Sequence, residues 1–71
     1  MKLKSTAPII DDEIKWLVIE SDENDTGGFF LYHYKKDNTA YDTWHKTIDD
    51  AFEAAYLQYN VTRENWEKIG K

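Results

Sequence analysis

The stretch Tyr41-Asp42-Thr43-Trp44-His45-Lys46-Thr47-Ile48-Asp49-Asp50-Ala51-Phe52-Glu53-Ala54-Ala55 predicts a strand that runs directly into a helix. Its first residues, 41–45, are rich in aromatic and β-branched types, which suit a half-buried pleated surface. Thr47 offers a hydroxyl as helix N-cap, and acidic side chains follow in the first turn, where the helix dipole favours negative charge. The spacing Thr47-x-x-Asp50 is close to a capping box, with Asp in place of Glu or Gln.

The helix is predicted to run from about Ile48 to Tyr59. Its apolar residues recur at steps of three and four and form one stripe, made of Ile48, Ala51, Phe52, Ala55 and Tyr59. Asn60 suits a left-handed C-terminal position, and Val61 is expected to fold back on the last turn. Thr62 is then expected to cap a short second helix over 63–69, with Trp66 and Ile69 on one face.

Two further strands are predicted upstream, over 14–20 and 29–34, from their β-branched and aromatic content. Short links, with Asp37-Asn38 at one tip, make these strands and 40–45 an antiparallel meander. Residues 1–8 show no amphipathic period and are expected to form a flexible arm before a folded core over 9–69. The predicted fold class is therefore α+β: one domain, with a three-stranded antiparallel meander packed on one main helix (β-β-β-α) and a short C-terminal helix.

The composition excludes several classes of function. The 71 residues carry a net charge of −5, so we expect no nucleic acid as partner, because a negative field repels phosphate. The absence of cysteine excludes disulfides and thiolate metal sites. No apolar run approaches the roughly 20 residues of a membrane span, and no signal peptide precedes the domain, so we expect a cytoplasmic protein without a membrane partner.

His33 and His45 are the only histidines, and both flank the predicted hairpin at similar distances from its turn. Two imidazoles side by side, with Asp42 as a third ligand, would suit a transition metal. We favour two partly exposed strand histidines, because no ligand-spacing motif accompanies them. The acids Asp49, Asp50 and Glu53 are explained by the helix dipole rather than by acid–base catalysis. No metal, no cofactor and no enzymatic activity are therefore expected.

The loop Asp22-x-Asn24-x-Thr26-Gly27 has the opening pattern of a calcium loop. Its twelfth position is His33, where such a loop needs a bidentate Glu. A solvated acidic turn is the preferred interpretation.

The abundance of aromatic residues is the most suggestive feature, with three Trp, five Tyr and three Phe in 71 residues. One helix cannot bury all of those in the predicted sheet, and the candidate partner-contact surface comprises Phe30, Tyr32, Tyr34, Tyr41 and Trp44. Tyr and Trp are favoured at protein contacts because they bury much area with few rotamers to freeze. The alternative is that the N-terminal arm and the Trp66 segment cover these rings. Stacking of single-stranded bases would need surrounding basic residues, and acids dominate here.

The segment from Asp42-Thr43-Trp44-His45 through Thr47-Ile48-Asp49-Asp50-Ala51 resembles a group of small uncharacterised bacterial β-β-β-α proteins, which also carry a tryptophan near the C-terminus. The resemblance covers residues 14–68 and implies no site. A looser similarity is to HicB-type antitoxin domains, which share three strands and a helix entered at Thr-Leu-Glu-Glu-Ala, here Thr47 to Ala51. The proline and glycine motif of that family is absent before the third strand.

We therefore expect a non-enzymatic protein-interaction module that binds a protein or another copy of itself. The first alternative is an acidic inhibitor of the antitoxin or immunity type, which neutralises a basic protein. The second is a metal-dependent enzyme that uses His33 and His45.

Overall fold

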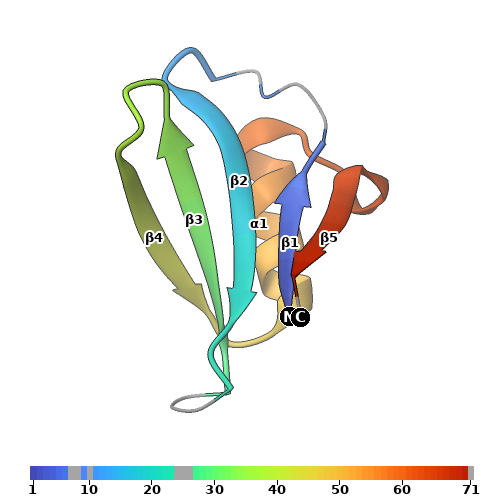
Figure 1. The fold of residues 1–71 in the computed structure, drawn as a ribbon. Helices are drawn as coiled ribbons and strands as arrows, with labels where there is room; N and C mark the ends of the chain where they lie inside the picture. The colour runs from blue at the N-terminus through green and yellow to red at the C-terminus, as the bar shows by residue number, and fades with distance from the viewer. Residues whose placement is uncertain (7–8, 10, 24–26, 71) are drawn as a thin grey trace.

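The computed structural model describes residues 1–6, 9, 11–23 and 27–70. Within them one antiparallel sheet packs against one helix (Figure 1). The elements are β1 (Lys2–Ser5), β2 (Ile14–Ser21), β3 (Phe29–Lys35), β4 (Ala40–His45), α1 (Ile48–Tyr59), a 3-10 turn (Arg63–Asn65) and β5 (Trp66–Gly70). The strand order across the sheet is β4-β3-β2-β1-β5.

The predicted three-stranded sheet is wrong, because the sheet has five strands. The expected flexible arm contains β1, which pairs with β2 on one side and β5 on the other. Leu3 lies opposite Ile19 and packs on the core, whereas Lys2 and Lys4 project to the other side. Four residues are too short to show a convincing alternation, and their partners are far away in the sequence. Ala7 and Pro8, also assigned to the arm, lie outside the described residues.

The predicted second helix is also wrong. The helical part ends after one 3-10 turn at Asn65, and the chain then enters β5. Trp66 pairs with Ser5 in the ladder, and its ring lies 5.8 Å from the ring of Phe52. A helix of seven residues gains too little to persist alone, whereas β1 offers a complete edge for backbone hydrogen bonds.

In the central part of the chain the main helix is found where it was predicted, and the three predicted strands are neighbours within the larger sheet. Strands β2, β3 and β4 are consecutive neighbours, and α1 runs from Ile48 to Tyr59. The hydroxyl of Thr47 accepts a hydrogen bond from the N–H of Asp50 at 3.1 Å, as the sequence predicted for the cap. Asn60 adopts φ 59°, and the buried Val61 folds back on the helix end.

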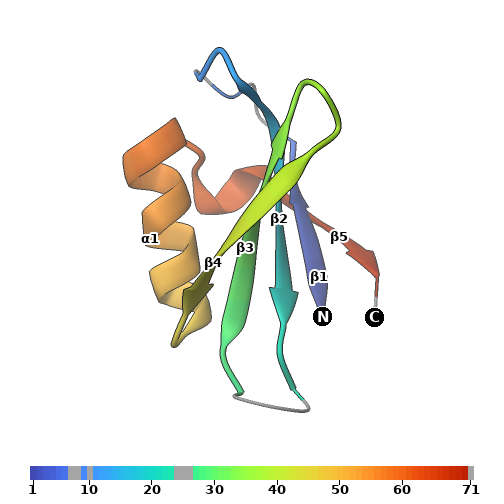
Figure 2. The same ribbon diagram turned by 90° about the vertical axis from the view of Figure 1, so that its left-hand side faces the viewer.

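The core lies between α1 and one face of the sheet, as Figure 2 shows edge-on. Its buried apolar residues are Ile14, Leu17, Ile19, Leu31, Ala51, Ala55, Tyr59 and Val61. The register between β2 and β3 shifts between Ile14 and Trp16, so one extra residue on β2 turns Ile14 toward the core and Trp16 away from it. The second face of the sheet is not covered by α1.

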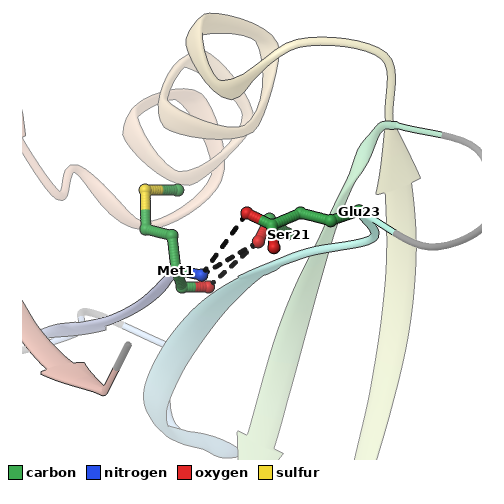
Figure 3. A network of polar contacts seen from close by, with 3 residues as sticks. All are labelled: Met1, Ser21 and Glu23. Atoms are coloured by element: carbon green, nitrogen blue, oxygen red, sulfur yellow. Dashed lines mark hydrogen bonds and ion pairs between the residues drawn. The ribbon is translucent and has the colours of Figure 1, made fainter.

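The position of β1 is secured by polar contacts at both of its ends. The buried hydroxyl of Ser5 accepts a hydrogen bond from the backbone N–H of Leu17 at 3.1 Å. At the other end Met1 meets the end of β2: its ammonium group donates to Ser21 Oγ at 3.0 Å and lies 4.0 Å from Glu23 Oε1 (Figure 3). The Ser21 N–H also donates to the Met1 carbonyl at 3.1 Å.

We predict that Ser5→Ala lowers the free energy of unfolding by about 1–3 kcal/mol, because the buried N–H of Leu17 loses its acceptor. Urea denaturation followed by circular dichroism measures this change. Thr6→Ala is the control, because the Thr6 hydroxyl bonds an exposed carbonyl that water can also satisfy. Equal stability of Ser5→Ala and wild type would contradict the placement of β1.

Candidate functional site

The face of the sheet opposite α1 carries three rows of side chains, which follow from the strand registers. We call it the open face. Its upper row is Ala40, Tyr34 and Trp16; its middle row is Asp42, Tyr32, Val18 and Lys4; its lower row is Trp44, Phe30, Glu20 and Lys2. Among the described segments, α1 and the 3-10 turn lie on the other side of the sheet, and no segment crosses the open face (Figure 2).

Aromatic rings run along the open face in an unbroken chain. Ring centroids are 5.5 Å apart between Trp16 and Tyr34, 6.4 Å between Tyr34 and Tyr32, and 6.0 Å between Tyr32 and Phe30. Such tilted pairs contribute roughly 0.5–1.5 kcal/mol each beyond their buried area. The rings therefore hold one another in place and present a pre-ordered apolar stripe.

Trp44 extends the stripe onto β4 and is 47% exposed. It lies opposite Phe30 in the ladder, and a Cβ built on Gly28 would overlap its indole ring. The indole of Trp44 therefore packs directly on Gly28, and a larger residue at position 28 would displace the ring from the sheet.

Charged groups border the stripe on both sides. The ammonium groups of Lys4 and Lys15 lie 4.3 and 4.7 Å from the ring centre of Trp16. Burial raises the pKa of Tyr32, and the nearby carboxylates of Glu20 and Asp42 raise it further. Asp42 thus places an acid on the β4 side of the stripe, whereas the β1 side carries Lys4 and the ion pair between Lys2 and Glu20.

Four of the five residues predicted as a contact surface lie on the open face: Phe30, Tyr32, Tyr34 and Trp44. Tyr41 does not, because it lies opposite His33 on the face that meets the helix. Its ring stacks on the His33 ring at 4.4 Å, with 5° between the planes. Sequence alternation within 40–45 already separates Tyr41 from Trp44, since they are three residues apart on a strand.

Trp16 and Lys4 belong to the open face but were not among the predicted contact residues. Trp16 is two residues from Val18 on β2, so strand alternation puts both on one face, and this was a usable signal. The pairing of β2 with β3 brings Trp16 beside Tyr34 only because β2 contains a bulge. The pairing of β1 with β2 brings Lys4 beside Val18, and these two segments are distant in the sequence. Neither register can be read from local pattern.

Below the sheet, His33 lies in a chain of polar side chains that joins α1 to β3 and β4. Its Nδ1 lies 2.7 Å from the hydroxyl of Tyr59, and its Nε2 lies 3.2 Å from Thr43 Oγ1. Thr43 Oγ1 is 2.9 Å from His45 Nε2, and the hydroxyls of Tyr41 and Tyr59 are 3.4 Å apart. The hydrogen bonds along this row of side chains can all form with the donors pointing either from Tyr41 toward His45 or the reverse, because each hydroxyl donates one hydrogen bond and also accepts.

Burial lowers the pKa of His33, and the neighbouring His45 lowers it further. The imidazole is fully buried and all its polar atoms are hydrogen-bonded, so it remains neutral at physiological pH. Burial, together with the hydrogen bond to Tyr41, raises the pKa of Tyr59. These polar side chains form a buried network in which the hydrogen-bonding atoms of His33 all have partners, and the network stabilises a defined packing of the helix on the sheet.

The prediction of two partly exposed histidines is wrong for His33, which is fully buried. The structure does bring the two histidines together, but through Thr43 rather than directly across the ladder. The described residues contain no cluster of three or more His, Asp or Glu side chains that would hold a metal ion. Asp42, proposed as third ligand, lies on the open face with Tyr32. Residues 24–26 of the calcium-like loop lie outside the described residues.

Comparisons with protein-family models, with curated proteins and with solved structures give no match. None of the helical segments in the described part of the chain has the length and apolarity that a bilayer crossing requires.

We predict that the stability of the protein falls as the pH is lowered from 7.5 to 5.5. The unfolded chain takes up a proton on His33 near pH 6.5, whereas the folded state takes it up only at lower pH. The unfolded state then binds more protons, so the stability that neutral His33 provides is present above about pH 6.5 and is lost below it.

Thermal unfolding at several pH values measures this effect, and His33→Gln is the informative variant because its amide does not titrate. The variant should show a flatter pH profile than wild type across this window, where carboxylates contribute little. A wild-type profile that is flat, or one that the substitution leaves unchanged, would contradict a neutral buried His33.

Proposed function

We propose that this chain is a non-enzymatic, cytoplasmic protein-interaction module whose contact surface is the open face of the sheet. One observation carries the proposal: the ring chain Trp16–Tyr34–Tyr32–Phe30 lies on a sheet face that no other described segment covers. These four rings are half-buried and Trp44 beside them is exposed, and a contiguous apolar patch of this kind marks interaction sites in soluble proteins.

The aromatic side chains of the stripe are already held in fixed positions before a partner binds, which favours binding. A protein that must freeze flexible side chains on contact loses about 0.5–1.5 kcal/mol for each. Here the rings already pack on one another, and Lys4 and Lys15 pack on Trp16. A partner that covers the stripe therefore gains apolar burial with little loss of side-chain freedom.

The charges on the open face indicate the chemistry of the partner. Asp42 lies beside Tyr32 and Glu20 lies beside Phe30, so carboxylates adjoin the rings. Glu20 is paired with Lys2 at 3.6 Å, whereas Asp42 stands at the exposed end of its row. A protein surface that offers apolar groups and a Lys or Arg side chain would cover the rings, pair with Asp42 and stack on Tyr32.

The two alternatives gain no comparable support. An inhibitor of a basic protein needs its acids on one face, but Asp42 is on the open face while Asp49 and Glu53 are on the solvent side of α1. An enzyme based on the histidines needs substrate access to His33, which is fully buried.

We predict that a photo-crosslinking amino acid in place of Trp44 forms a covalent adduct with a protein in the producing cell. Trp44 and the control position Tyr56, on α1, are 47% and 52% exposed, so they sample solvent equally. The adduct should form at position 44 and not at position 56. Its partner, identified by mass spectrometry and purified, should bind wild type and Tyr56→Ser, and should bind Tyr32→Ser at least about tenfold more weakly.

Failure to form an adduct at position 44, or adducts of equal yield at both positions, would contradict the proposed contact surface. Equal binding of the purified partner to Tyr32→Ser and wild type would contradict it as well.

A further inference from the structure

We infer that the occupant of the open face is a second copy of this chain, packed face to face across a two-fold axis that runs along the strands between β2 and β3. The inference rests on the proposed function, because it names the partner of the same surface. It follows from the order of the side chains within the rows, which is fixed by the strand registers.

The middle row runs from an acid to a base across four adjacent strands: Asp42 on β4, Tyr32 on β3, Val18 on β2 and Lys4 on β1. A two-fold axis between β2 and β3 exchanges β3 with β2 and β4 with β1. It therefore brings the backbone position of Lys4 in each copy opposite Asp42 of the other, and that of Tyr32 opposite Val18; the Lys4 side chain, which lies over Trp16 in the single chain, reaches Asp42 by changing rotamer. The row is self-complementary, as a symmetric dimer interface requires.

The other two rows meet across the same axis. In the lower row, Lys2 of one copy faces Trp44 of the other, which is the arrangement of a cation above an exposed indole. Phe30 faces Glu20 of the other copy, whose carboxylate is paired with Lys2 of its own chain. In the upper row, Trp16 of one copy faces Tyr34 of the other and adds a ring contact between copies.

An axis in the plane of the interface but perpendicular to the strands would be unfavourable. Such an axis would place each strand over the same strand of the other copy. Asp42 would then face Asp42 and Lys4 would face Lys4, so that like charges meet. The charges thus select one symmetric arrangement, in which the strands of the two sheets run in nearly the same direction. This is the aligned packing of β-sandwiches, with sheets about 10 Å apart.

The size of the face sets the expected affinity. Four strands about 4.8 Å apart and three rows along them cover a patch of roughly 20 by 20 Å. A dimer would bury roughly 800–1,000 Å² in total, near the lower limit for a specific interface. We therefore expect a reversible dimer with a dissociation constant of about 1–100 μM, which only concentrated samples reveal.

Sedimentation velocity of the full chain from about 2 to 500 μM tests the inference. Wild type should shift from monomer to dimer within this range. Lys4→Glu and Asp42→Lys should each raise the dissociation constant at least about tenfold, because each sets like charges opposite one another. The double variant, which carries both reversals, should restore dimerisation, because the two charges then attract again with their signs exchanged.

Glu53→Lys on α1 is the matched control, since it changes the charge equally and should leave the dimer intact. Thermal unfolding by circular dichroism checks that each variant is folded, and higher salt should weaken the wild-type dimer. The milder Lys4→Gln, expected to weaken the dimer less than Lys4→Glu, replaces Lys4→Glu if the latter does not fold.

A wild type that remains monomeric at 500 μM overturns the inference, as does a dimer that the charge reversals leave unchanged or that the double variant fails to restore. These results leave the proposed function intact if the crosslink at position 44 joins a different protein. An adduct of twice the chain mass supports both, and no adduct together with a strict monomer overturns both.

Discussion

A single helix cannot cover both faces of a five-stranded sheet, and this constraint shapes the whole molecule. Helix α1 has 12 residues and lies along one face, where its stripe of Ala51, Ala55 and Tyr59 meets the buried side chains of β2 and β3. A helix about 10 Å wide also leaves the margins of that face to other groups. Trp66 fills one margin beside Phe52, and the network around His33 fills the other. No helix of the described residues lies on the opposite face, where the aromatic rings pack on one another and Lys4 and Lys15 pack on Trp16.

Polar side chains are accommodated differently on the two faces of the sheet. On the helix side, the imidazole of His33 is removed from water and must find partners, which Tyr59 and Thr43 supply. Its hydrogen bonds link the last turn of α1 to β3 and β4. On the open face, charges remain near water, and Lys4 and Lys15 lie over Trp16 instead of entering the core. The buried network stabilises the packing of the helix on the sheet, and the rings of the open face remain half-buried.

Much of the central chain could be predicted because its signals are local. The Thr47 cap, the left-handed Asn60 and the hairpin between β3 and β4 each depend on residues within one turn. Strand alternation in β3 also suffices to separate Phe30, Tyr32 and Tyr34 from Leu31 and His33. The ends of the chain were misjudged for the opposite reason. Lys2–Ser5 and Trp66–Gly70 carry weak local patterns, and each becomes a strand because it pairs with a segment at the other end of the sequence.

The sequence by itself determined the helix with its caps, the central meander and the presence of more aromatic rings than one helix can bury. These features follow from side-chain periodicity and from residues close together in the chain. Only the tertiary structure decided that the sheet has five strands, that Tyr41 packs under it beside His33, and that an acid and a base stand at opposite ends of one row on the open face. Strand register decides these points. It is set by backbone pairing between distant segments and by the bulge in β2, and a shift of one residue would exchange the two faces.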